Sequence, residues 1–234
     1  MKRVEISGGY QFACRRIGSG FPVVFCSSVG SAGSNWYETI EHVKEPITGL
    51  LYNRARILPS DPRPEPKTLG YRQRADELGR LLDALDFPRP AINVGHSIGA
   101  LYGRLFASQN PDQVAGFVLV DSSLEGQRPF PGGRLINDGL EPPDTELGAR
   151  ELQGLTPPLV PAAVVSQRPG NWEEQIYHYP PGSAELWSAN QRRLVAMLGA
   201  EHYVSTHSGH NLPDEDPELV AEAIDGIVRQ TREV

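Results

Sequence analysis

Cysteine is scarce in this chain, and long hydrophobic runs are missing from it. Only Cys14 and Cys26 occur among the 234 residues, and both lie in apolar, strand-like stretches. We therefore expect two reduced, buried thiols and no disulfide framework. No apolar run approaches the ~18 residues of a membrane-spanning helix. No hydrophobic segment follows the basic residues near the start, so we expect no signal peptide. These absences favour a cytoplasmic protein.

Positive charge is also in short supply. The chain has 22 Lys and Arg against 29 Asp and Glu, a formal net charge of −7. A nucleic-acid partner usually calls for a basic face, so this balance argues against one, and it also disfavours anionic membranes. His207 and His210 form only a lone pair, which is a weak metal signal. We expect a small-molecule substrate and no metal or cofactor, while the oligomeric state stays open.

The remaining pattern is an alternation of short β-rich runs with helical periodicity. It is typical of one α/β domain, here residues 1–234, with a mostly parallel sheet and helices on both faces. The predicted strands are residues 5–6 and 12–16 as an antiparallel edge, then 22–26, 49–52, 91–94, 116–120, 162–166 and 203–206. The predicted helices cover residues 71–85, a stretch after residue 99 with Leu101, Leu105 and Phe106, then 184–198 and about 217–231.

Residues 122–161 break this alternation with proline, glycine and scattered charges. A structureless loop of this length is uncommon in a compact domain unless it is functional, so we predict a lid inserted into the domain. Apolar lid residues indicate an acyl or otherwise apolar pocket, unless they only pack the lid onto the body. They are Phe130, Leu135, Leu140 and Leu159.

The pentapeptide Gly95-His96-Ser97-Ile98-Gly99 lies between a predicted strand and a predicted helix. A serine hydroxyl is a poor nucleophile unless a base takes its proton and donors hold the oxyanion. A strand–turn–helix with this pattern presents serine on a sharp turn and directs the first helical N–H groups, with that of Ile98 nearest, at the site. We interpret Ser97 as the nucleophile. The alternative is a tight structural turn with a capping serine.

The general base is expected on the loop that follows the last strand. His210 lies there, in the segment Ser208-Gly209-His210, and loops at the carboxyl edge of an α/β sheet converge on one site. His207, at the end of the predicted strand, is the second choice. His96 adjoins Ser97 in sequence and cannot easily face it from the same turn, so we interpret His96 as structural.

The acid that orients the base is the most open assignment. Asp121 follows a buried strand and is favoured, although Asp121-Ser122-Ser123 is also a plausible capping turn. No aspartate directly follows the predicted strand 162–166, but Glu173 or Glu174 could reach the site instead.

These segments resemble the α/β-hydrolase fold superfamily, in its small lipase- or esterase-like branch. Residues 95–99 resemble the nucleophile elbow, residues 110–121 the next strand and its approach, and residues 208–210 the segment of the catalytic histidine. The order Ser97, Asp121, His210 matches the family order. In most members the acid follows the later strand, and in a subset it follows the strand that ends before Asp121.

The resemblance also implies a second oxyanion donor, with two departures from the family pattern. The segment Ser27-Ser28-Val29-Gly30 stands where the family has a His-Gly segment, so the Val29 N–H is the candidate donor by position. Tyr52-Asn53-Arg54 resembles a Tyr-Asp-Arg segment that normally continues with glycines. Here it continues with Ala55-Arg56-Ile57-Leu58, which suggests an altered pocket rim.

The leading hypothesis is hydrolysis of a carboxylic ester, thioester or lactone through an acyl-Ser97 intermediate. Peptidase, lyase and cofactor-free peroxidase chemistry also resemble this fold, since function is not implied by the fold alone. A non-catalytic small-molecule receptor on the same scaffold is a further alternative. Dinucleotide binding is disfavoured because the Gly95–Gly99 segment lacks the middle glycine of that fingerprint.

Overall fold

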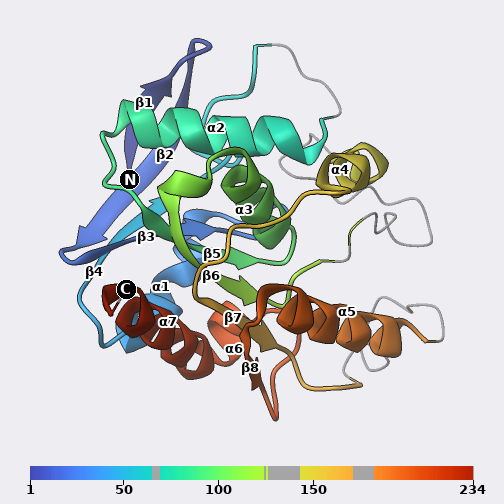
Figure 1. Ribbon diagram of the computed structural model, residues 1–234. Helices are drawn as coiled ribbons and strands as arrows, with labels where there is room; N and C mark the ends of the chain where they lie inside the picture. The colour runs from blue at the N-terminus through green and yellow to red at the C-terminus, as the bar shows by residue number, and fades with distance from the viewer. Residues whose placement is uncertain (65–68, 124, 126–142, 171–181, 234) are drawn as a thin grey trace.

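The computed structural model describes residues 1–64, 69–123, 125, 143–170 and 182–233. An eight-stranded sheet in the order β1-β2-β4-β3-β5-β6-β7-β8 forms its centre (Figure 1). The strands are β1 (Lys2–Ile6), β2 (Tyr10–Gly18), β3 (Phe21–Cys26), β4 (Ile47–Tyr52), β5 (Ala91–His96), β6 (Val114–Val120), β7 (Ala162–Ser166) and β8 (Glu201–Val204). This is the predicted α/β class, and the structure confirms it.

Strand direction determines where a site can form. β1 pairs with β2 and β2 with β4 in antiparallel fashion, which confirms the predicted antiparallel edge. The strands from β4 through β3, β5, β6 and β7 to β8 are parallel neighbours. Their carboxyl ends therefore lie along one edge, where the connecting loops converge.

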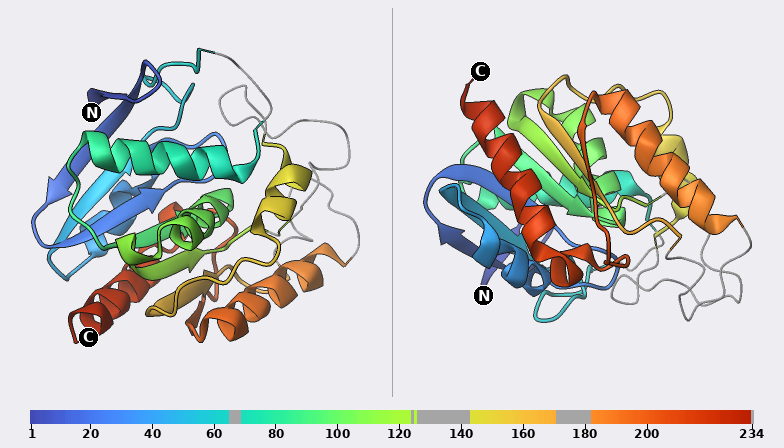
Figure 2. Two further views of the ribbon diagram at one scale, coloured as in Figure 1. Left: turned by 45° about the horizontal axis from the view of Figure 1, so that its top comes forward. Right: turned by 90° about the horizontal axis from the view of Figure 1, so that it is seen from below.

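Helices cover both faces of the sheet (Figures 1 and 2). α2, α3, α4 and α5 contribute to the apolar core on one face, and η1, α1 and α7 to the core on the other. The helices are η1 (Gly33–Trp36), α1 (Tyr37–His42), α2 (Tyr71–Ala84), α3 (Ile98–Gln109), η2 (Pro111–Gln113), α4 (Thr145–Leu152), α5 (Ser183–Leu198), α6 (Leu212–Glu215) and α7 (Pro217–Arg232).

The two cores follow from the period of two in a strand. In β6, Phe117 and Leu119 face the core beneath α2 and α3, whereas Val118 and Val120 face the core beneath α7. Successive side chains of a strand point to opposite faces, so a strand covered on both sides is a continuous apolar run. This explains why residues 116–120 are all buried.

Three sequence predictions need correction. The last strand is β8, Glu201–Val204, and not residues 203–206, because its pairing with β7 begins at the polar Glu201. An edge strand tolerates polar residues that hide it from a search for apolar runs.

The segment 122–161 also holds a helix, α4, whose N-cap Asp144 accepts a hydrogen bond from the Leu147 N–H at 2.8 Å. A two-turn helix is too short to show a clear periodicity.

The third correction concerns Leu159, which was predicted to help line an apolar pocket in the lid. It lies before the start of β7, at the opposite edge of the parallel sheet from Ser97, and is 96% exposed. Leu159 lies with Met197 and Leu198 around a surface hollow. Phe130, Leu135 and Leu140 lie outside the described residues, so the lid itself stays a prediction.

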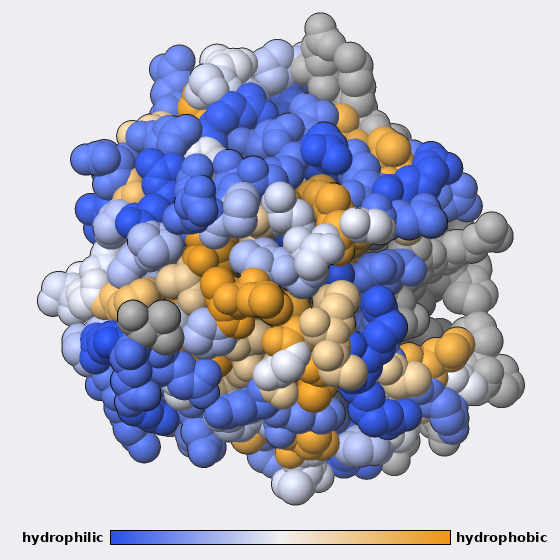
Figure 3. All heavy atoms as spheres, in the orientation of Figure 1, coloured by the Kyte–Doolittle hydropathy of each residue, from blue (hydrophilic) through white to orange (hydrophobic). Residues whose placement is uncertain are grey.

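The surface is polar over most of the face in Figure 3, where hydrophilic side chains cover α2 and α7. Apolar side chains form a band along the loop that joins α4 to β7. Within the described ranges, no helix has the length and apolar character needed to cross a membrane. Cys14 and Cys26 are both buried and free, as predicted.

The core beneath α7 gives a stability prediction. Ile224 is fully buried there, so Ile224→Ala removes apolar contacts and leaves a cavity. We expect the free energy of unfolding, measured by urea denaturation, to fall by about 2–5 kcal/mol. The exposed neighbour Glu222 supplies the control, and Glu222→Ala should stay within about 0.5 kcal/mol of the unsubstituted protein. Equal losses in both variants would contradict this packing.

Candidate active site

Ser97 occupies a sharp turn between β5 and α3. Its backbone has φ 56° and ψ −123°, a conformation that is uncommon for a residue with a side chain. A Cβ on Gly95 would overlap the backbone of Ala100, and one on Gly99 would overlap the carbonyl oxygens of Cys26 and Ser27. The flanking glycines are therefore required by close backbone approach. They let the start of α3 lie against both β5 and the loop after β3.

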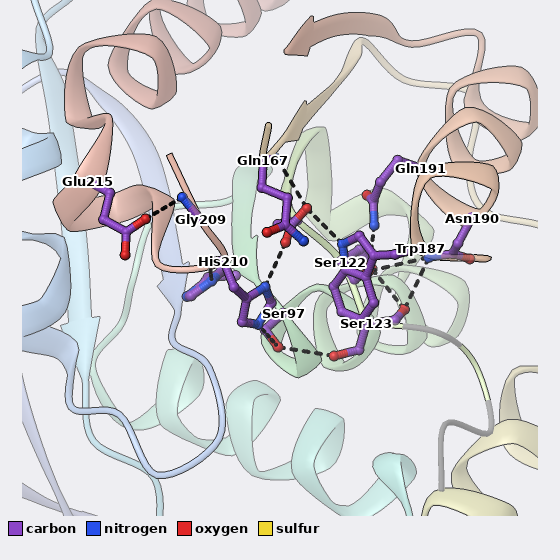
Figure 4. A network of polar contacts seen from close by, with 12 residues as sticks. Ser97, Ser122, Ser123, Gln167, Trp187, Asn190, Gln191, Gly209, His210 and Glu215 are labelled. Atoms are coloured by element: carbon purple, nitrogen blue, oxygen red, sulfur yellow. Dashed lines mark hydrogen bonds and ion pairs between the residues drawn. The ribbon is translucent and has the colours of Figure 1, made fainter. Parts of the chain in front are cut away.

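A hydrogen-bonded chain runs from Ser97 through His210 to Asp121, and Figure 4 shows Ser97 beside His210. Ser97 Oγ lies 3.0 Å from His210 Nε2, and His210 Nδ1 lies 2.6 Å from Asp121 Oδ2. Asp121 is fully buried and its N–H donates to the Val165 carbonyl at 2.7 Å. The structure thus brings together the three residues that the sequence predicted as nucleophile, base and acid. This geometry can move a proton from the serine to the imidazole.

Two hydrogen bonds to the rest of the protein hold the loop that carries His210. His96 Nε2 donates to the His210 carbonyl at 2.7 Å, and the Gly209 N–H donates to the Glu215 carboxylate (Figure 4). His96 is fully buried, and burial lowers its pKa from the ordinary 6.5 to about 3. Burial is the largest cause of this lowering of the pKa, and the proximity of His210 contributes in the same direction. A neutral His96 therefore serves as a hydrogen-bond donor in the body of the protein, consistent with its predicted structural role.

The second oxygen of Asp121 has its own donors. Oδ1 accepts from the Trp187 indole Nε1 at 2.8 Å and from the Gln167 N–H at 3.2 Å. Trp187 comes from α5, and its ring meets the His210 ring edge-on with centroids 5.2 Å apart. These contacts hold the carboxylate and the imidazole in one arrangement and compensate for the burial of a charge.

A buried arginine orients the loop after β3. Arg54 donates from Nη1 to the Ser27 carbonyl at 2.7 Å and from Nη2 to the Ser28 carbonyl at 2.5 Å. In a trans peptide the carbonyl and the following N–H point in opposite directions. The N–H groups of Ser28 and Val29 therefore point away from Arg54. Val29 lies on the loop that contacts the elbow, as the predicted oxyanion donor must, and Ile98 begins α3 directly after Ser97.

Not every predicted candidate reaches this site. His207 Nε2 lies 3.2 Å from the Glu215 carbonyl and its side chain is largely exposed, so the second choice of base makes no contact with Ser97. Glu173 and Glu174, the alternative acids, lie outside the described residues. Among the described residues, no group of three or more His, Cys, Asp or Glu side chains is arranged to hold a metal ion.

Sequence reasoning missed the polar residues of α5 that support the site. Asn190 Nδ2 donates to the Ser122 carbonyl at 3.3 Å, and Gln191 Nε2 donates to the same carbonyl at 2.8 Å. Trp187, Asn190 and Gln191 have the i, i+3, i+4 spacing of one helix face, and all three are buried. Polar side chains within the apolar stripe of a helix are the signal that could have identified them.

Comparison with known proteins decides the family. A family model described as the alpha/beta hydrolase fold matches residues 22–160, more than half of the chain. The chain belongs to the α/β-hydrolase fold family. A curated relative from Bacillus subtilis, YqjL, described as uncharacterized, is 31% identical over 110 residues. That match covers 47% of this chain and 43% of YqjL, so it spans less than half of the relative.

Solved α/β-hydrolase structures match over nearly the whole chain. A thermophilic esterase from Thermogutta terrifontis is 18% identical, with a TM-score of 0.70 and 99% of each chain covered. An enol-lactonase from Burkholderia xenovorans LB400 is 16% identical, with a TM-score of 0.71, and the match covers 97% of this chain and 100% of that one. At these identities the likeness establishes the fold alone.

The lowered pKa of His96 predicts how acid affects stability. Unfolding restores its ordinary pKa of 6.5, so between about pH 3 and 6.5 the unfolded chain binds the extra proton. Stability therefore rises with pH through this window and is lost as pH falls below 6.5. His96→Gln keeps an N–H donor but does not titrate. We expect the unsubstituted protein to lose up to about 1.4 kcal/mol more per pH unit than His96→Gln between pH 6 and pH 4.

Urea denaturation of both proteins at pH 7, 6, 5 and 4 measures this difference. Carboxylates and the other histidines titrate in both proteins, so their contribution cancels in the comparison. Parallel stability curves would contradict a neutral, buried His96.

Proposed function

We propose that this protein is a serine hydrolase that cleaves a carboxylic ester, thioester or lactone through an acyl-Ser97 intermediate. One observation carries the proposal, namely the hydrogen-bonded chain from Ser97 through His210 to Asp121 at a strained strand–helix turn. A serine alone is a weak nucleophile, and this arrangement supplies both a base within reach and an acid that orients it. The esterase and lactonase that share the fold support the choice of ester-type bonds.

In the proposed reaction, Ser97 Oγ attacks the substrate carbonyl while His210 Nε2 takes the Ser97 proton. His210 then gives that proton to the leaving group, and the acyl group remains on Ser97. Water attacks the acyl carbon, loses a proton to His210, and the bond from that carbon to Oγ breaks as His210 returns the proton to Ser97. Asp121 stabilises the imidazolium throughout and fixes the proton on Nδ1.

The oxyanion that forms in each half-reaction requires donors. The N–H groups of Ile98 and Val29 are the proposed pair of donors. The Ile98 N–H lies at the start of α3. Arg54 binds the Ser28 carbonyl, so the Val29 N–H of the same peptide points away from Arg54. Donors that are already in position before the reaction need no reorganisation when charge develops on the oxygen. Each such donor lowers the activation free energy by about 3 kcal/mol.

Labelling with a fluorophosphonate tests the nucleophile. We expect covalent addition to the Ser97 peptide, identified by mass mapping, and its loss in Ser97→Ala and in protein unfolded before labelling. Ester turnover should disappear in the same variant. A native protein that forms no adduct and cleaves no ester, thioester or lactone would reject the proposal in favour of a non-catalytic small-molecule receptor.

Substitution of the acid separates Asp121 from Glu173 and Glu174. Asp121→Asn retains the shape but removes the charge that holds the imidazole in the required tautomer. We expect kcat with an aryl ester to fall by about a hundredfold to ten-thousandfold. Glu173→Gln and Glu174→Gln should each stay within about threefold of the unsubstituted enzyme, because Asp121 already bonds to His210 Nδ1. The reverse result would assign the acid to the glutamate pair.

A further inference from the structure

A second hydroxyl lies within hydrogen-bond distance of the oxygen of the proposed nucleophile. Ser123 Oγ is 3.0 Å from Ser97 Oγ, the same distance that separates Ser97 Oγ from His210 Nε2 (Figure 4). The Ser–His–acid arrangement does not require this contact. Ser97 Oγ therefore has two side-chain partners, one from the loop after β8 and one from the loop after β6.

The structure holds Ser123 firmly in this place. Its N–H donates to the Ser97 carbonyl at 3.2 Å, so the backbones of the two serines are joined directly. Asn190 Nδ2 lies 3.4 Å from the Ser123 carbonyl and 3.3 Å from that of Ser122, and Gln191 Nε2 lies 2.8 Å from the latter. The hydroxyl is thus positioned by buried amides of α5 and does not sit on a loosely held turn.

The count of protons fixes the direction of the new hydrogen bond. Ser97 has a single hydroxyl proton, which must point at His210 Nε2 for the base to accept it. The His210 Nδ1 proton faces Asp121, so Nε2 has a lone pair available. With its proton committed to His210, Ser97 Oγ can only accept from Ser123, and Ser123 is the donor.

We propose that Ser123 is a further catalytic residue, which donates a hydrogen bond to Ser97 Oγ as negative charge develops on that oxygen. This inference rests on the proposed hydrolase function. In acylation, charge grows on Oγ as its proton moves to His210 and the bond to the acyl carbon forms. In deacylation, charge returns to Oγ as that bond breaks and before His210 restores the proton. Ser123 keeps its own proton in both steps.

A hydrogen bond of this kind favours the transition state over the resting enzyme. Its acceptor is neutral at rest and partly charged during the reaction, and bonds to charged groups are about twice as strong as neutral ones. Only an interaction that strengthens in the transition state accelerates the chemical step. We therefore expect Ser123→Ala to slow the attack of Ser97 by about tenfold, the difference between a charged and a neutral hydrogen bond.

The test is the second-order rate constant for modification of Ser97 by a fluorophosphonate. In this reaction the Oγ–P bond forms, fluoride leaves and His210 takes the serine proton, so only the attack step is measured. Ser123→Ala should react about tenfold more slowly than the unsubstituted protein, and Ser123→Thr, which keeps a hydroxyl, should recover most of that loss. Ser108→Ala is the matched control, because it removes a half-buried hydroxyl that bonds to the Arg104 carbonyl on α3.

Each outcome bears on one claim. If Ser123→Ala reacts within twofold of the unsubstituted protein, or if Ser123→Thr is as slow as Ser123→Ala, the hydroxyl has no catalytic part and the inference is overturned. If Ser108→Ala slows the reaction equally, the effect is structural and the inference is again overturned. An unsubstituted protein that takes up no fluorophosphonate overturns the proposed function itself, and thus differs from a failure at Ser123.

Discussion

The backbone of Ser97 is held in a conformation that side-chain-bearing residues rarely adopt, and the geometry of the site depends on it. The turn is enforced by its neighbours: the Ser97 N–H continues the ladder to the Val120 carbonyl at 2.9 Å, while α3 begins at the next residue. Gly99 leaves no room for a Cβ against the loop after β3. The strain is therefore offset by the sheet on one side and by close packing on the other. The result is a hydroxyl raised above the carboxyl ends of the parallel strands, where the loops that carry His210 and Asp121 also arrive.

The site also depends on a polar face of α5, whose side chains contact both the acid Asp121 and the loop that approaches Ser97. Trp187 donates to the carboxylate of Asp121. One turn further along α5, Asn190 donates to the Ser123 carbonyl and Gln191 donates to the Ser122 carbonyl. One rigid helix thereby sets the position of the acid and of the second hydroxyl together. Burying polar groups of this kind costs free energy unless they form hydrogen bonds. The rest of α5 packs through apolar residues such as Leu194, so the buried polar residues mark the face of the helix that supports the site.

Much of this arrangement could be predicted from the sequence, because the strongest signals are local. The strand, Gly-x-Ser-x-Gly turn and helix around Ser97 are contiguous, and Asp121 and His210 follow strands whose carboxyl ends must share an edge. The signals that failed are of other kinds. The pairing of β8 begins at a polar residue, α4 is too short for periodicity, and the contact of Trp187 with Asp121 joins positions 66 residues apart in sequence. Tertiary contacts between distant polar side chains leave no periodic trace in a single sequence.

The structure of the Ser97 adduct with a phosphonate, determined by crystallography, tests the central claim most directly, because the tetrahedral phosphorus mimics the intermediate and shows where its oxygen lies. We expect a covalent bond at Ser97 Oγ, the phosphoryl oxygen within hydrogen-bond distance of the Ile98 and Val29 N–H groups, and His210 still bonded to Asp121 through Nδ1. A phosphoryl oxygen directed away from both amides, or a His210 ring that has left Asp121 for another carboxylate, would contradict it.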